Sequence, residues 1–204
     1  MAFYRRVIFP RLCDLTLGQR FVAEYRKPLL AQARSDILEI GFGTGLNLPH
    51  YPEHVRRITA IEPNTGMSRR ARQRIEQSRI EVEQRQLGGE RLPFSDDCFD
   101  CVVSTFTLCS IDEVSRALGE VYRVLRPGGR FLFLEHGLSP DLGVRKWQRR
   151  LNRLQMWLAD GCRLDRDMRA LVAAQPFQSM ECEEFDMARS PRTHGHLYRG
   201  FAVK

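Results

Sequence analysis

Residues 37–64 of the chain read ILEIGFGTGLNLPHYPEHVRRITAIEPN: an apolar segment, a glycine-rich turn and a second apolar segment that ends in an acid. Residues 37–40 and 58–61 each have the length and the aliphatic character of a short buried strand. Between them, glycines at every second position let the backbone approach a ligand closely, namely Gly41, Gly43 and Gly45. Glu62 follows the second strand, where the carboxylate of a βαβ unit accepts hydrogen bonds from a ribose diol. The stretch therefore predicts a site for a nucleoside-containing cofactor.

The spacing of these glycines indicates which cofactor is expected. A dinucleotide-binding turn reads G-x-G-x-x-G, whereas this chain has Leu46 at the last position, which disfavours a nicotinamide dehydrogenase. The pattern G-x-G-x-G, preceded by Glu39 and followed by Glu62, resembles that of the class I S-adenosylmethionine-dependent methyltransferases. A tight turn in any α/β protein would explain the glycines alone. It would not explain two acids at these distances.

The composition is that of a folded protein of one domain. The 204 residues are 43% hydrophobic and 28% charged, which suffices for a full core. No apolar run approaches the ~20 residues that span a bilayer. Residues 1–15 do not have the pattern of a signal peptide, so we expect a cytoplasmic protein. The formal charge of +7 is compatible with acidic small molecules, lipid headgroups or nucleic acid, and does not distinguish among them.

The six cysteines do not form a recognisable metal-binding pattern. Only Cys98 and Cys101 have C-x-x-C spacing, and neither a second pair nor a neighbouring histidine completes a zinc set. We therefore expect no metal. In a reducing compartment the others are expected to be small core and loop residues: Cys13, Cys109, Cys162 and Cys182.

Strand-like and helix-like segments alternate along the rest of the chain. Besides the two strands above, we expect strands at residues 80–87, 100–106, 130–135, 180–187 and 196–204. Helices are expected within 1–35 and at 65–78, 110–125 and 142–174, the third of them starting at a capping box of Ser110 and Glu113. This order predicts an α/β fold: a Rossmann-like, doubly wound, mostly parallel seven-stranded sheet with an antiparallel C-terminal hairpin.

Other segments extend the resemblance to methyltransferases. Residues 89–104 (GERLPFSDDCFDCVVS) resemble the adenine-side turn and fourth strand of class I enzymes, and residues 125–136 (LRPGGRFLFLEH) resemble the fifth strand of ubiquinone and menaquinone C-methyltransferases. Three more pieces look like the methyltransferase-like seven family, which is associated with S-methylation of thiols. They are STFTLCSI (104–111), LADGCRLDRD (158–167) and HLYRGFAVK (196–204).

Two departures from that family stand out. Residues 1–35 lack the apolar membrane anchor of the animal proteins, and Gly88 stands where many class I enzymes have an aspartate. The resemblance implies a single methyltransferase domain over residues 1–204. Within it, 1–35 form a helical lid, 36–137 the cofactor-binding core, and 138–204 the acceptor-side helices and closing strands.

By resemblance, the cofactor is S-adenosylmethionine, with Glu62 on its ribose and the glycine loop near its methionine part. Gly88, Gly89 or Glu90 replaces the missing aspartate near the adenine. The residues expected to bind the cofactor are Glu39, Gly41, Phe42, Gly43, Thr44, Gly45, Asn47, Glu62, Pro63, Asn64, Met67, Gly88, Gly89, Glu90, Thr105 and Phe106.

The acceptor side is predicted from the ends of strands four and five. His136 ends the fifth strand and is expected to act as a general base or to hydrogen-bond the substrate, with a purely structural histidine as the alternative. Asp100 begins the fourth strand, where a structural role is favoured and a polarising catalytic role is the alternative. Cys109 is expected to line the pocket. The turn containing Asp160 and Cys162 is expected to shape it.

The expected activity is methylation of a small-molecule acceptor, a thiol first. A phospholipid amine or a quinone precursor at the membrane surface is the nearest alternative, because residues 145–158 form a basic amphipathic segment. Residues 104–107 (STFT) lack the Asx-Pro-Pro-aromatic signature of exocyclic-amine methylation, so no nucleic-acid partner is expected. A module that binds the cofactor without catalysis is the remaining alternative.

Overall fold

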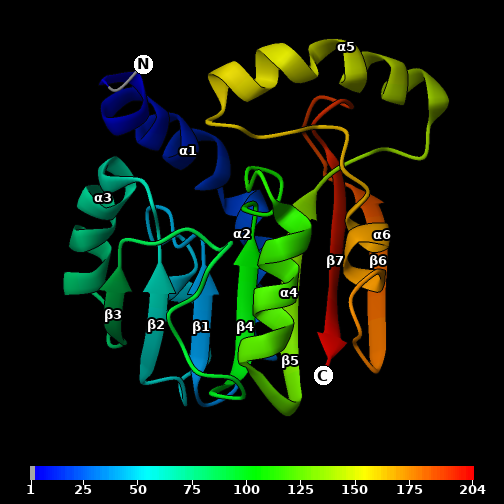
Figure 1. The fold of residues 1–204 in the computed structure, drawn as a ribbon. Helices are drawn as coiled ribbons and strands as arrows, with labels where there is room; N and C mark the ends of the chain where they lie inside the picture. Colours follow the sequence, from blue (N-terminus) through cyan, green and yellow to red (C-terminus); the bar gives the residue numbers. More distant parts are fainter. Residues whose placement is uncertain (1–2) are drawn as a thin grey trace.

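One seven-stranded sheet organises the protein, as shown by a computed structural model that describes residues 3–204 (Figure 1). Across the sheet the strand order is β3-β2-β1-β4-β5-β7-β6. The first five are parallel, whereas β7 is antiparallel to both β5 and β6. This confirms the predicted fold class. The strands are β1 (Ile37–Ile40), β2 (Arg57–Ile61), β3 (Glu81–Arg85), β4 (Phe99–Thr105), β5 (Leu125–His136), β6 (Ser179–Asp186) and β7 (His196–Val203).

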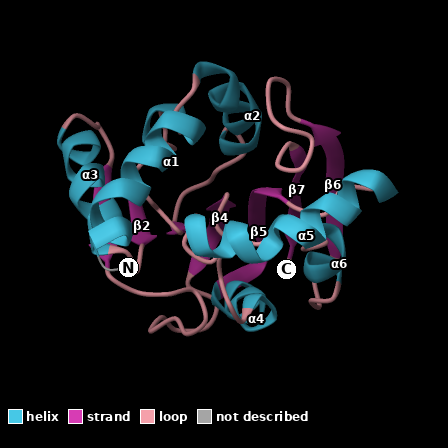
Figure 2. Cartoon of the chain, turned by 90° about the horizontal axis from the view of Figure 1, so that it is seen from above, coloured by secondary structure: helices cyan, strands magenta, loops and turns pink. Residues whose placement is uncertain are grey.

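Helices cover both faces of the sheet. Helices α2 (Arg20–Leu30) and α3 (Thr65–Glu76) pack on one face, and α4 (Val114–Val124) and α6 (Met168–Ala173) pack on the other. Figure 2 shows α2 and α4 on opposite sides of the strands. A short 3-10 turn, η2 (Leu48–His50), follows the glycine loop.

The central strands are buried on both faces, which explains their continuous apolar sequences. In β5, Phe131 and Phe133 point into the cluster under α4, whereas Leu132 and Leu134 point into the cluster under α2. All four side chains are fully buried. Each such burial stabilises the fold by about 1.5–3 kcal/mol.

The sheet changes its direction of growth between β1 and β4, which are neighbours. In open α/β sheets, ligands bind at such a point, outside the carboxyl ends of the strands. Figure 1 shows α1 (Phe9–Leu17) and α5 (Leu142–Leu158) above this edge, together with the N-terminal turn η1 (Tyr4–Ile8). Of the predicted helical lid over residues 1–35, η1 and α1 lie above this edge, whereas α2 packs on a face of the sheet. The lid stays a prediction, and its first two residues lie outside the described residues.

Two local predictions were wrong, one of them only in part. The predicted helical region 142–174 is interrupted at the expected turn, where Asp160 and Gly161 adopt left-handed backbone angles (φ 50° and 89°), and the next helix begins only at Met168. The predicted capping box is not formed either. Helix α4 starts later than expected, with Glu113 as its N-cap, and makes no side-chain cap hydrogen bond, while the N–H of Ser110 donates within a turn to the carbonyl of Thr107.

Candidate functional site

A cavity of about 510 Å³ opens at the carboxyl ends of β1, β2 and β4. This volume lies within the range of small-molecule sites. Strand ends and the loops after them form one side, and η1, α1 and the loop after α5 form the other. The cavity wall includes fourteen of the residues predicted to bind the cofactor: Gly41, Phe42, Gly43, Thr44, Asn47, Glu62, Pro63, Asn64, Met67, Gly88, Gly89, Glu90, Thr105 and Phe106. The predicted residues that do not line it are Glu39 and Gly45.

The glycine loop owes its shape to positions where a side chain does not fit. Gly41 has φ 70°, and a Cβ there would lie 2.1 Å from Oγ1 of Thr107. Gly43 has φ 57°, and a Cβ there would find no neighbour closer than 3.8 Å. The Gly41 N–H donates to the carbonyl of Ile61 and the Gly43 N–H to the carboxylate of Glu62. These two amides are engaged within the protein, so the glycines contribute space for a ligand rather than free donors.

Glu62 follows β2 and places its carboxylate on the cavity wall. Its Oε2 accepts a hydrogen bond from the N–H of Gly43, and its Oε1 accepts one from the N–H of Asn64, each at 2.8 Å. Each carboxylate oxygen has two lone pairs, so one on each oxygen is left for a ligand hydroxyl. Burial raises the pKa of Glu62, and the two N–H donors counteract part of the shift. The geometry suits a vicinal diol.

Glu39 lies beneath the cavity and positions a residue that lines it. Its Oε1 accepts from Nδ2 of Asn47 at 2.9 Å and its Oε2 from the hydroxyl of Tyr51 at 2.7 Å. Arg26 Nε donates to Oδ1 of Asn47 at 3.0 Å. Burial raises the pKa of Glu39 to about 7, against the lowering effect of these donors and of Arg26. The predicted role in binding is therefore replaced by a role in orienting Asn47.

The end of β4 carries a strained aromatic residue on the cavity wall. Phe106 has φ 53°, a left-handed conformation that aromatic residues rarely adopt. Its ring lies 5.1 Å from the guanidinium carbon of Arg26, and its N–H donates to the carbonyl of Leu134. Next to it, Oγ1 of Thr105 accepts from Nδ2 of Asn47 at 3.0 Å. Such strain is typical of functional sites, where the surrounding structure holds the residue in place.

The loop after β3 forms the apolar wall of the cavity. A Cβ on Gly89 would lie 3.2 Å from side-chain carbons of both Ile40 and Ile111, so the backbone packs tightly there. Leu87 and Glu90 line the same part of the cavity. A slot with apolar walls and a nearby carboxylate suits a flat base with an exocyclic amine.

A cap formed by two distant segments closes over the cavity, and sequence reasoning did not foresee its contacts. Arg5 of η1 forms a 2.5 Å ion pair with Asp160 of the loop after α5. The hydroxyl of Tyr4 donates to the carbonyl of Leu158 at 2.6 Å. Asn64 joins both segments to the cofactor side, because its Nδ2 donates to Oδ2 of Asp160 and to the carbonyl of Arg5, both at 3.1 Å. The side chains of Arg5 and Asp160 are among those that line the cavity.

The two residues predicted to be catalytic do not line the cavity. Asp100 lies at the amino end of β4, at the edge opposite the cavity, where it accepts from Arg126 at 2.7 Å and from the N–H of Asp36. The hydrogen bond from Arg126 lowers the pKa of Asp100. This corrects the candidate polarising role to a structural one. His136 does end β5, but its Nε2 lies 2.9 Å from Sγ of Cys162.

Comparisons with known proteins identify the family of the chain. A family model described as a methyltransferase domain matches residues 38–133. The human thiol S-methyltransferase TMT1A is 34% identical over 174 residues, which cover 82% of this chain and 70% of TMT1A. A phosphatidylethanolamine N-methyltransferase of Cereibacter sphaeroides is 35% identical over 129 residues, which cover 61% of this chain and 63% of that protein. The chain thus spans about two thirds of the length of these relatives.

Solved structures show the same fold. A SAM-dependent methyltransferase from Thermotoga maritima superimposes with a TM-score of 0.71 at 20% identity, covering 100% of this chain and 98% of the other. The residues that line the cavity fit S-adenosylmethionine, because the Glu62 carboxylate has acceptor capacity left for a ribose diol and the Gly43 backbone leaves space beside it. The chain belongs to the class I S-adenosylmethionine-dependent methyltransferases, in the family that includes TMT1A, and S-adenosylmethionine is its cofactor.

Proposed function

We propose that this methyltransferase acts on the sulfur of a small, apolar thiol. The similarity to TMT1A is the observation that carries the proposal. The matched stretch of 174 residues is far longer than the methyltransferase segment 38–133. It therefore includes parts of the chain outside that segment.

The cap gives the cavity an apolar lining of the kind such an acceptor needs. Phe9, Cys13 and Leu17 of α1 line the cavity, as do Leu46 and Phe106 from the strand-end loops. Burial raises the pKa of Cys13 to about 12, so this thiol stays protonated and acts as an apolar contact.

The charges on the wall favour the reactive form of a thiol. Arg6 and Arg26 both line the cavity, and positive charge stabilises a thiolate relative to its thiol. The bound cofactor supplies an electrophilic methyl group. Transfer breaks the bond from the sulfonium sulfur to the methyl carbon, forms a bond from the acceptor sulfur to that carbon, and releases the thiol proton. Orientation of the two reactants supplies roughly 7–11 kcal/mol of the barrier reduction.

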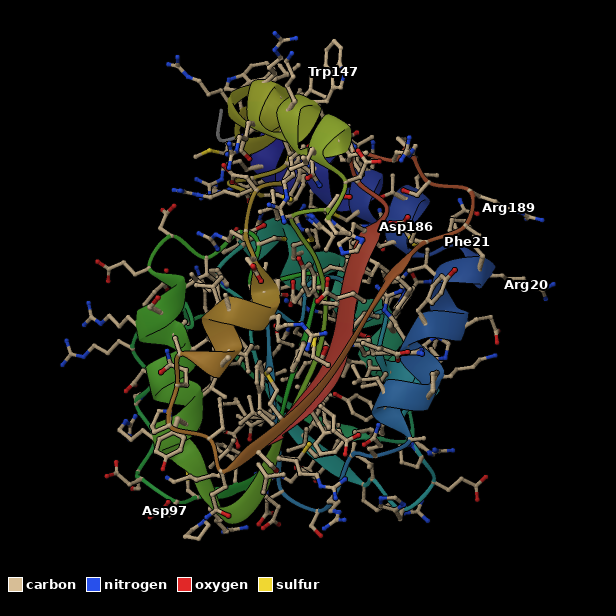
Figure 3. All side chains as sticks on the ribbon, turned by 90° about the vertical axis from the view of Figure 1, so that its right-hand side faces the viewer. Arg20, Phe21, Asp97, Trp147, Asp186 and Arg189 are labelled. Atoms are coloured by element: carbon tan, nitrogen blue, oxygen red, sulfur yellow. The ribbon has the colours of Figure 1, made fainter. Side chains whose placement is uncertain are left out.

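A second candidate is methylation of a phospholipid amine at a membrane surface. The Cereibacter relative supports it, and so does the distribution of large exposed apolar side chains. Figure 3 shows Trp147 pointing away from the body of the protein, at the end opposite Asp97. No helix within residues 3–204 is long and apolar enough to cross a membrane. On η1, α1 and α5 or beside them, the exposed apolar residues are Phe3, Ile8, Leu12, Leu15, Leu142, Trp147, Leu154, Trp157 and Leu158.

Transfer of a labelled methyl group to matched acceptors tests both candidates. Each alkyl thiol is paired with the alcohol and the amine of the same chain, and vesicles of phosphatidylethanolamine are assayed beside them. We expect turnover of the thiols, with the alcohols and amines near background. Transfer to the vesicle lipid but not to any thiol would replace the first candidate by the second. Cofactor binding with no transfer to any acceptor would refute both.

A further inference from the structure

Three side chains with soft donor atoms meet behind the cavity wall. The sulfur atoms of Cys109 and Cys162 and a ring nitrogen of His136 all lie within 4.8 Å of one another. Cys109 belongs to the loop between β4 and α4, His136 ends β5, and Cys162 lies in the loop between α5 and α6. We call this set the Cys2His cluster. It joins three segments that are far apart in the sequence.

The binding of S-adenosylmethionine leaves this cluster unused. None of its members lines the cavity. Ser110, which follows Cys109, and Asp160, which lies two residues before Cys162, do line it. Cys109 is 2% exposed and Cys162 is 7% exposed. One nitrogen of His136 faces Cys162, and the other, Nδ1, is buried without a hydrogen-bond partner among residues 3–204. The cluster is thus a buried set of donor atoms that the cofactor cavity does not use.

We infer that the Cys2His cluster binds a zinc ion. Two thiolates and an imidazole are ligands that Zn²⁺ prefers, and three protein ligands leave a fourth tetrahedral position for water. Zn–S bonds of about 2.3 Å and Zn–N bonds of about 2.0–2.1 Å place the donor atoms roughly 3.5–3.8 Å apart. The 2.9 Å distance from His136 to Cys162 must open by roughly 0.6–0.9 Å for this. The other pairs must close by about 1.0–1.3 Å at most, which side-chain rotation supplies.

The charge balance favours a divalent ion. Two thiolates, one Zn²⁺ and a neutral imidazole form a group with no net charge, which is far less costly to bury than separated charges. The neighbouring charges have their own partners. The Glu135 carboxylate accepts from the hydroxyl of Ser104 at 2.8 Å and from the N–H of Thr107 at 2.9 Å, and the Arg166 guanidinium donates to the carbonyl of Leu108. The Glu135 carboxylate is therefore already engaged, and the positive charge of Arg166 is held by a backbone carbonyl.

An ion at the Cys2His cluster would fasten the cap to the sheet. At present the N–H of Arg163 donates to the carbonyl of Cys109 at 3.0 Å, which already brings the two loops together. Asp160 lies two residues before Cys162 and pairs with Arg5 over the cavity. Zinc would therefore fix the loop that carries Asp160. This inference concerns the metal and does not rest on which acceptor is methylated.

Metal analysis of the whole protein tests the inference. The untagged chain is purified without chelator, and zinc and copper are measured together by mass spectrometry. We expect about one zinc per chain. Cys109→Ser and Cys162→Ser should bring zinc to background, whereas Cys182→Ser, a matched change on β6, should leave it unchanged. Cobalt titrated into the metal-free protein should give the visible bands of a tetrahedral thiolate site.

A measurement on the unmutated protein guards against variants that fail to fold. Removal of zinc by a chelator should lower Tm, and zinc at a hundredfold excess over its Kd should raise Tm again by about 5–10 °C. The inference is overturned if the purified chain lacks zinc and neither zinc nor cobalt binds on titration. It is equally overturned if zinc stays bound in both serine variants, if copper occupies the site instead, or if an intact mass lower by two hydrogens shows a Cys109–Cys162 disulfide.

Discussion

Replacing Glu62 by alanine should weaken the binding of S-adenosylmethionine by about 10–100-fold. Both oxygens of this carboxylate already accept one backbone N–H at 2.8 Å, so each has one lone pair left for a ribose hydroxyl. A hydrogen bond to a charged group contributes about 1.5–3 kcal/mol. Water that enters the space left by the side chain recovers part of the two bonds. The net loss of about 1.4–2.8 kcal/mol corresponds to the stated factor.

Isothermal titration calorimetry with S-adenosylmethionine and with S-adenosylhomocysteine measures this loss. Glu62→Gln is the second variant, because it keeps the volume but puts an NH₂ group opposite one of the two backbone donors. Glu81→Ala on β3 is the control: it removes the same charge from an exposed site that does not line the cavity. A folded Glu62→Ala protein with the Kd of the parent would refute the assignment of this carboxylate to the ribose.

The pH dependence of binding follows from the same group. The ionised carboxylate is the form that accepts from both hydroxyls, and burial raises the pKa of Glu62. Affinity should therefore fall as the pH drops through that raised pKa. The fall should begin at a higher pH than the usual value of about 4.3 would give.

Three further outcomes are expected. A carboxyl whose folded pKa is raised to about 7 stabilises the fold at low pH and loses that contribution as the pH rises. In the parent protein, Glu39 should therefore contribute about 2–3 kcal/mol more to the unfolding free energy at pH 5 than at pH 8. Urea titrations at the two pH values should show that Glu39→Gln removes this contribution. Gly41→Ala should destabilise the protein by about 2–4 kcal/mol, because the new Cβ would strike Thr107 and the backbone there is left-handed. Gly43→Ala should cost only about 1–2 kcal/mol of stability, and its main effect should be weaker cofactor binding. Equal losses of stability would contradict this. Arg5→Ala should speed hydrogen exchange in α1 by about 1.4–5-fold, the range for one exposed ion pair, and an unchanged rate would show that the pair does not hold the cap.

The sequence predicted the cofactor half of the site because its parts are local. Residues 37–62 contain a strand, a turn with left-handed glycines, a second strand and the acid after it, and each follows from neighbours along the chain. The alternation of strands and helices likewise predicted the sheet. The same logic favours a structural role for Asp100: it is the second residue of β4, so five residues of extended chain, roughly 16 Å, separate it from the ligand edge.

Only the tertiary structure showed that Glu39 lies beneath the cavity. Its hydrogen-bond partners are Asn47 and Tyr51, which follow the glycine loop, and Asn47 is in turn held by Arg26 of α2. The sequence predicted a turn at Asp160 and Cys162, but it did not show that this loop forms one half of the cap over the cavity. The pairing of that loop with Arg5 joins segments about 155 positions apart, for which no spacing rule exists.

The sequence by itself thus determined the fold class and most of the predicted residues that line the cavity, because strand periodicity, glycine conformation and the acid at a strand end act over a few residues. The tertiary structure alone decided which contacts hold the cap and which cysteines meet His136. Those contacts depend on how whole elements pack, and packing is a property of surfaces that come together only when the chain is folded.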